Sequence, residues 1–155
     1  MQLLFKQRMF SWFDSYDIYD ETERPVFTVK GRLSWGHMLE IFDQAGNHIG
    51  TLKEEIFHLI PRFSIYFGDN YVGSIRKEFT LFRPSYTLDC NGWQVDGDVF
   101  GWNYSVSDAY GGQVLSAHKQ MAWTDTYVID IKNTEDALIS LMIVLAIDAA
   151  NCDRN

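Results

Sequence analysis

Residues Ala137–Ile147 read ALISLMIVLAI, and Ser140 is the only polar side chain among these eleven residues. The stretch follows about 130 residues in which apolar and polar side chains repeatedly alternate. A helix that is apolar on every side has to lie in a membrane or be surrounded by protein. The fold therefore depends on which of these two environments the segment occupies.

The length and the ends of this segment favour burial in protein. At about 1.5 Å per residue, eleven helical residues cover roughly 16 Å, which is about half of the ~30 Å hydrocarbon core of a bilayer. An aspartate follows directly, and no group of Lys or Arg residues flanks the run. Asn133 or Thr134 can cap a helix N-terminus, and Glu135 and Asp136 suit its first turn. We predict a buried helix over about residues 134–150 and no transmembrane segment.

Upstream of the helix, apolar side chains recur with a period of two. Phe27, Val29, Leu33 and Trp35 alternate with polar neighbours, which predicts a half-buried strand with this apolar set facing inward. The same alternation occurs in residues 62–67 and 127–132, and turn sequences separate such runs at 43–47, 68–70, 91–92 and 108–112. Strands and tight turns repeated without a helical crossover predict antiparallel hairpins in a meander.

Two of these segments resemble each other. Residues 47–55 and 70–78 match at an offset of 23, with Gly50 and Gly73 at equivalent positions. This predicts one hairpin motif used twice in a curved sheet. A glycine inside a strand indicates a β-bulge or the close approach of another element.

The number of strands and the apolar helix together predict a closed barrel. A sheet of roughly ten or more strands does not stay open and flat, and closing it leaves a lumen that side chains must fill. A helix of 15–17 residues is roughly 24 Å long, which is comparable to strands of about seven residues. We therefore predict a mainly-β fold in which the C-terminal helix fills the barrel, within a single domain over residues 1–155.

Composition excludes some classes of partner. The 155-residue chain has a formal net charge of −8, whereas nucleic-acid binding needs a basic surface, so we expect no nucleic-acid partner. Cys90 and Cys152 form no pattern, and the N-terminus lacks the apolar segment of a signal peptide. These features predict reduced thiols and a cytoplasmic location.

No constellation in the sequence indicates catalysis, a cofactor or a metal. There is no Gly-x-Ser-x-Gly motif, and Cys90 and His118 are far apart in the sequence. The four histidines have no partner at metal-ligand spacing, and no phosphate-binding glycine loop occurs. We predict no catalytic, cofactor-binding or metal-binding residues, and we do not expect an enzyme.

Two acidic groups leave calcium as an alternative. The first lies between the early strands and fits a solvated turn better than an EF-hand loop. The second group precedes the helix. Asp136 is explained as a helix-start residue and Asp130 as part of the polar face of a strand, and calcium binding at this group stays an alternative. The first group is Asp14, Asp17, Asp20, Glu21 and Glu23, and the second is Asp125, Asp130 and Asp136.

Asp148 and a group of aromatic residues complete the candidates. A carboxylate near the end of a buried helix is unfavourable unless it is paired or solvated, so we expect Asp148 to emerge at the mouth of the barrel. A proton- or ligand-responsive role is the alternative. A set of aromatic residues fits barrel packing better than a ligand cage. The set is Trp93, Phe100, Trp102, Tyr104 and Tyr110.

Short segments spread along the whole chain carry a further signal: Phe5–Gln7, Phe10–Ser11, Asp14, Tyr16–Asp20, Pro25–Gly31, Lys77–Thr80 and Trp123–Ile131, with the helix closing on Ile147–Asp148. In kind and order they resemble the LURP-one-related family, within the tubby C-terminal-like superfamily that includes phospholipid scramblases. The resemblance implies a closed antiparallel β-barrel of about twelve strands, over about residues 2–132, wrapped around a hydrophobic C-terminal α-helix. The chain lacks the cysteine-rich cluster and the proline-rich N-terminal arm of scramblase-like members.

These observations predict a soluble, non-catalytic binding or interaction module whose biochemical function the sequence does not identify. The resemblance implies one alternative, a peripheral protein that binds phospholipid or phosphoinositide. An enzyme with a cleft on the outer wall is a second alternative. The partner is therefore a phospholipid surface or another protein, and its identity stays open.

Overall fold

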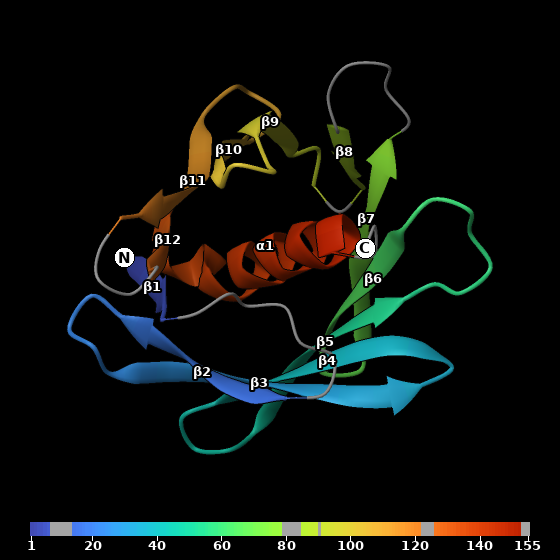
Figure 1. Cartoon of the computed structure of the whole chain (residues 1–155), viewed down its shortest axis with the longest axis horizontal. Coiled ribbons are helices and arrows are strands. Elements are labelled where there is room, and N and C mark those ends of the chain that lie inside the picture. Colours follow the sequence, from blue (N-terminus) through green and yellow to red (C-terminus); the bar gives the residue numbers. More distant parts are fainter. Residues whose placement is uncertain (7–13, 79–84, 90, 122–125, 153–155) are drawn as a thin grey trace.

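The computed structural model describes residues 1–6, 14–78, 85–89, 91–121 and 126–152, and within them twelve strands close into an antiparallel barrel around one helix (Figure 1). Each strand pairs with its neighbours in the chain, and β1 closes the ring against β12 through pairs such as Leu3 with Ile129. The predicted fold class is confirmed. The strands are β1 (Gln2–Phe5), β2 (Ser15–Asp20), β3 (Pro25–Ser34), β4 (Gly36–Asp43), β5 (His48–Glu54), β6 (Arg62–Phe67), β7 (Asn70–Glu78), β8 (Ser85–Leu88), β9 (Gln94–Asp98), β10 (Asn103–Ser107), β11 (Gln113–Gln120) and β12 (Thr126–Ile131).

The helix α1 (Ala137–Cys152) crosses the interior, with the strands on all sides of it (Figure 1). Every side chain from Leu141 to Ile147 is at most 1% exposed, because the inward-facing residues of the strands cover the helix all round. A short 3₁₀ turn, η1 (Thr134–Asp136), precedes it. Asn133 occupies the cap position before this turn but makes no capping hydrogen bond with its side chain. The helix is thus buried as predicted, although its start is later than expected.

The two similar segments form equivalent strands, β5 and β7. Each contains a register shift immediately before its glycine: Ile41 pairs with Gly50 and Phe42 with His48, while Ile65 pairs with Gly73 and Tyr66 with Tyr71. A β-carbon on Gly50 would lie 3.3 Å from the sulfur of Met142, so β5 approaches α1 closely at this point. The predicted bulges and the predicted close approach are both present.

In the part of the chain that the structure describes, no helix is long and apolar enough to cross a membrane.

Candidate functional site at one rim of the barrel

The alternating strand directions place the connections of the barrel at two opposite rims. The β3–β4, β5–β6 and β9–β10 connections lie at the rim where α1 ends, and we call this the helix-exit rim. The link between helix and rim is direct, because Lys77 near the end of β7 reaches the carbonyl oxygen of Ala150, with Nζ at 3.4 Å. The β2–β3, β4–β5, β6–β7 and β10–β11 turns and the β12–η1 connection lie at the helix-entry rim.

Large exposed apolar side chains are concentrated at the helix-exit rim. The described residues expose ten of them, and eight lie on or beside connections of this rim. Tyr71 and Tyr110 are the two that lie toward the helix-entry rim. Six of the eight belong to two neighbouring connections and form what we call the apolar rim patch: Leu33, Trp35, Ile56, Phe57, Leu59 and Ile60.

Contacts between the two connections hold this patch together. Gly36 has a φ of +93°, and a β-carbon there would lie 2.4 Å from Ile56 Cγ2 and 3.0 Å from the backbone oxygen of Glu54. Only glycine fits this turn, since both the left-handed backbone and the close approach exclude a side chain. His37 also binds Glu54, with its backbone N–H 3.2 Å and its Nδ1 2.7 Å from Oε2. The β3–β4 tip is thereby fixed against the β5–β6 loop.

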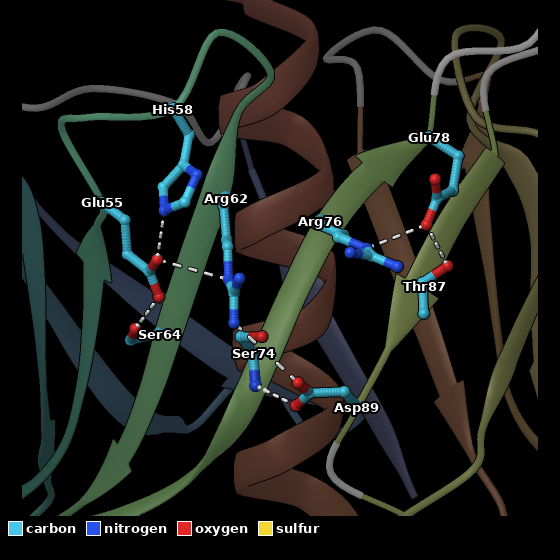
Figure 2. A network of polar contacts seen from close by, with 9 residues as sticks. All are labelled: Glu55, His58, Arg62, Ser64, Ser74, Arg76, Glu78, Thr87 and Asp89. Atoms are coloured by element: carbon cyan, nitrogen blue, oxygen red, sulfur yellow. Dashed lines mark hydrogen bonds and ion pairs between the residues drawn. The ribbon is translucent and has the colours of Figure 1, made fainter.

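A polar network lies on the outer wall beside the patch (Figure 2). Glu55, which follows β5, accepts a hydrogen bond from Ser64 at 2.6 Å and lies 2.9 Å from His58 Nε2 and 3.3 Å from Arg62 Nε. These contacts connect the two ends of the β5–β6 loop and hold the apolar residues between them outward. Arg62 also extends toward Asp89, with Nη2 and Oδ2 4.0 Å apart.

A second part of the network lies on β7 and β8, and α1 passes behind β7 (Figure 2). Glu78 accepts a hydrogen bond from Thr87 at 2.6 Å and one from Arg76 Nε at 2.9 Å. The hydrogen bond from Thr87 is the main reason why the pKa of Glu78 lies below its ordinary value. A groove between this group and the β5–β6 loop is lined by Phe57–Ile60, Arg62 and Arg76–Glu78.

Lys77 links the rim to the end of the helix. Its side chain is buried, and Nζ lies 3.4 Å from both the Ala150 carbonyl oxygen and Asn151 Oδ1. The ammonium also lies 5.4 Å from the ring centroid of Phe100, and Tyr86 donates a hydrogen bond to the same Asn151 oxygen. A cation at a helix C-terminus is stabilising because it interacts with the helix dipole and the last carbonyl groups.

Asp148 lies inside the barrel, which corrects the expectation that it emerges at the mouth. The residue is 4% exposed. Burial raises the pKa of Tyr16 and of Tyr104, and the nearby charge of Asp148 raises both pKa values further. The last turns of α1 are still enclosed by the barrel, since Ala149 and Ala150 are buried as well, so Asp148 lies in the interior and not in solvent at the mouth.

The first acidic group serves the β2–β3 turn and its neighbours. Asp20 accepts hydrogen bonds from the Thr22 backbone and hydroxyl at 2.8 Å and 2.6 Å and from the Arg24 backbone at 3.0 Å. These bonds, the Thr22 hydroxyl first, lower the pKa of Asp20. Glu21 accepts from the Gln2 backbone at 3.0 Å, and that bond lowers its pKa in turn. These two carboxylates form a turn, as the preferred interpretation expected.

The second acidic group is not brought together where the structure describes it. Asp125 lies outside the described residues. Asp130 accepts a hydrogen bond from Gln2 Nε2 at 2.6 Å and lies 3.4 Å from His118 Nδ1, whereas Asp136 is in η1 near Asn133. Across residues 1–6, 14–78, 85–89, 91–121 and 126–152, no three His, Cys, Asp or Glu residues are arranged to hold a metal ion.

The aromatic candidates divide between packing and exposure. Tyr104 is buried, and Trp102 lies 4.6 Å from the Tyr127 ring and 6.2 Å from the Tyr104 ring, which is aromatic packing in the barrel wall. Phe100 and Tyr110 are exposed, so the expectation of packing was wrong for these two. Cys90 and the side chain of Cys152 lie outside the described part, and with them the Cys90–His118 candidate.

The apolar rim patch is what the sequence interpretation missed. Leu33 and Trp35 were expected to face inward with Val29, but they are 77% and 86% exposed. β3 has ten residues and continues past the rim as a ribbon with β4, where no interior is left for its apolar face. The sequence did contain one signal in Ile56–Ile60, an IFHLI run between Glu55 and Pro61 without the strand period.

The fold and site define a class of protein: a closed antiparallel barrel plugged by its own helix, with an apolar rim where that helix ends. The family model described as LURP-one-related matches residues 1–148, and the chain belongs to this family. It is 30% identical over 149 residues to the uncharacterized protein YxjI of Bacillus subtilis (strain 168), covering 96% of this chain and 92% of that protein.

A solved structure supports the same fold. The X-ray structure of a protein from Arabidopsis thaliana superposes with a TM-score of 0.67 at 17% identity, covering 96% of this chain and 90% of the other. Among the segments that suggested the family, Tyr16–Asp20, Pro25–Gly31 and Thr126–Ile131 lie in β2, β3 and β12. Residues 7, 10–11, 79–80 and 123–125 lie outside the described part.

Proposed function

We propose that the chain is a single-domain, non-catalytic binding module that docks onto its partner through the helix-exit rim. The observation that supports this is the concentration of exposed apolar side chains there, eight of ten among the described residues. A contiguous exposed apolar patch bordered by polar groups is typical of an interaction surface, whereas single exposed apolar residues are ordinary.

The helix-filled interior favours binding at a surface over catalysis in a pocket. Small-molecule sites are usually concave and enclosed, but side chains of α1 occupy the lumen of this barrel. A groove on the outer wall crosses β2, β3 and β4, and its charged groups are used structurally. Asp17 accepts a hydrogen bond from Thr28 at 2.8 Å, and the Lys30 ammonium lies 4.7 Å from the Phe42 ring centroid. An enzyme using such a cleft remains the weaker hypothesis.

A photo-crosslinking experiment tests the docking surface whatever the chemical nature of the partner. The photoreactive residue p-benzoylphenylalanine replaces Phe57 in one variant and Tyr110 in a matched control, because both positions are exposed but lie at opposite rims. After irradiation in cells, we expect adducts from position 57 and few from position 110. Equal labelling at the two positions, or none at either, would contradict the proposal. We further propose a cytoplasmic location, which the unpatterned cysteines support and which cell fractionation checks.

A further inference from the structure

We propose that the partner of the helix-exit rim is the surface of a lipid bilayer, into which the apolar rim patch inserts. This inference rests on the proposed docking function and specifies its partner. In this orientation the loop tips reach the boundary between head groups and acyl chains, and the helix-entry rim faces away from the membrane.

The shape of the patch fits a bilayer. Phe57 is 92% exposed, Leu59 is fully exposed and Trp35 stands at the tip of the β3–β4 ribbon, so the largest apolar groups protrude from loops. Protruding side chains need a complementary pocket in a protein partner, whereas a bilayer accommodates them without one. Trp is also enriched at membrane interfaces, where its ring lies at the level of the head groups.

The contacts below the patch suit insertion as a rigid unit. The Gly36–Ile56 approach and the His37–Glu54 contact join the two tips, and Glu55 fastens both ends of the loop through Ser64 and its neighbours. Loops already held in the bound geometry lose less conformational freedom on binding.

The distribution of charge gives the orientation. The side chains of the helix-entry connections 20–24, 43–47, 68–69, 108–112 and 132–136 include eight carboxylates but only two cations. Around the patch, positive and negative side chains are nearly balanced and largely paired, as in Arg32 with Glu40 at 2.7 Å and Arg76 with Glu78 at 2.9 Å. The carboxylates are Asp20, Glu21, Glu23, Asp43, Asp69, Asp108, Glu135 and Asp136, and the cations are Arg24 and Lys132.

This asymmetry lets an acidic protein approach a membrane by one end. A strand of six or more residues is roughly 20 Å long, and a charge at physiological salt is screened over about 8 Å. The acidic rim is therefore screened from a bilayer that contacts the other rim. Because the charges beside the patch are balanced, insertion of apolar groups is the main source of affinity, and we expect binding to persist at high salt.

Vesicle flotation tests the proposal with the full chain. We expect wild-type protein to float with phosphatidylcholine vesicles, with or without 20 mol% phosphatidylserine, at both low and high salt. The double variant F57S/L59S should partition at least about tenfold more weakly, since burying one large apolar side chain typically changes an equilibrium by roughly that factor. The control Y110S, at an equally exposed site on the opposite rim, should bind like wild type.

A contact measurement separates insertion from loss of folding. Lipids with brominated acyl chains quench tryptophan fluorescence on contact, and we expect them to quench the fluorescence of the wild-type protein. The W35F variant should still float with the vesicles but should show less quenching. Absence of wild-type flotation, or equal loss in Y110S and F57S/L59S, would overturn the bilayer proposal. If position 57 formed adducts with a protein but the wild type did not float, the bilayer proposal would be overturned and the proposed docking rim would stand. If there were neither adducts nor flotation, both proposals would be overturned.

Discussion

The close approach of β5 to the helix predicts a strong coupling between Gly50 and Met142. A β-carbon at Gly50 would lie 3.3 Å from Met142 Sδ and 3.4 Å from Leu138 Cδ1, which leaves room for about one atom. Gly50→Val adds three heavy atoms, and its two methyl groups extend about 1.5 Å beyond that β-carbon, into Met142 and Leu138. We expect this variant to lower the free energy of unfolding by about 1–3 kcal/mol through overpacking.

Removing the obstacle should largely relieve this penalty. Met142→Ala deletes three heavy atoms from a fully buried side chain and by itself should destabilise by about 2–5 kcal/mol. Because the number of atoms gained equals the number lost, the G50V/M142A double variant should be about 1–3 kcal/mol more stable than the sum of the single effects predicts.

Urea denaturation followed by far-UV circular dichroism measures the four free energies of this double-mutant cycle. Val106→Ala serves as a control partner for Gly50→Val, because it lies on β10, five strands away around the ring, and the two effects should add. If Gly50→Val were equally destabilising with and without Met142→Ala, within about 0.5 kcal/mol, the helix would not pack against β5 at this glycine.

Three further variants and a truncation test other parts of the structure. Gly97→Ala should lower the free energy of unfolding by about 2 kcal/mol or more, because φ is +117° and the new β-carbon would lie 2.7 Å from the Asn103 carbonyl oxygen. In Gly46→Ala, where φ is +82° and no atom lies within 4 Å, only the backbone strain of about 1–2 kcal/mol should remain in urea titrations. Asp20→Asn should lower the free energy of unfolding most at neutral pH. The pKa of Asp20 is lower in the folded than in the unfolded protein, so its carboxylate stabilises the fold above the unfolded pKa, and this contribution is lost as the pH falls through the folded pKa. Thermal melts at acid pH should therefore show a smaller difference between variant and wild type. A chain ending at Asn133 should show no cooperative melting, and a folded truncation would contradict the role given to α1.

Much of the architecture follows from two sequence patterns. The period of two over the strands and the run at Ala137–Ile147, apolar except for Ser140, each allow few arrangements, and together they predict a barrel filled by a helix. The glycines at positions 50 and 73 indicated the bulges for the same kind of reason, since a strand interior rarely contains glycine without a close neighbour.

The rim could not be predicted because periodicity does not show where a strand leaves the barrel. Leu33 and Trp35 continue the apolar alternation of Val29, yet the wall ends before them and they face solvent. The predicted position of Asp148 was wrong because the strands extend further around the helix than expected. Its position near the helix end suggested exposure, but how far the strands extend around α1 is a property of the assembled barrel.

The segment 76–78 connects the stability of the barrel with the proposed docking surface. Because side chains alternate along β7, Arg76 and Glu78 face outward and pair in the rim network, while Lys77 between them turns inward to the end of α1. A substitution at Lys77 should therefore affect both helix packing and the groove beside the patch, and its effect on binding would be ambiguous. The side chains of Trp35, Phe57 and Leu59 are exposed and therefore contribute little to the stability of the fold, so substitutions there report on docking alone. The segments that identified the family, such as Pro25–Gly31, contain none of the six residues of the apolar rim patch, which is why the family could be identified from the sequence before the site.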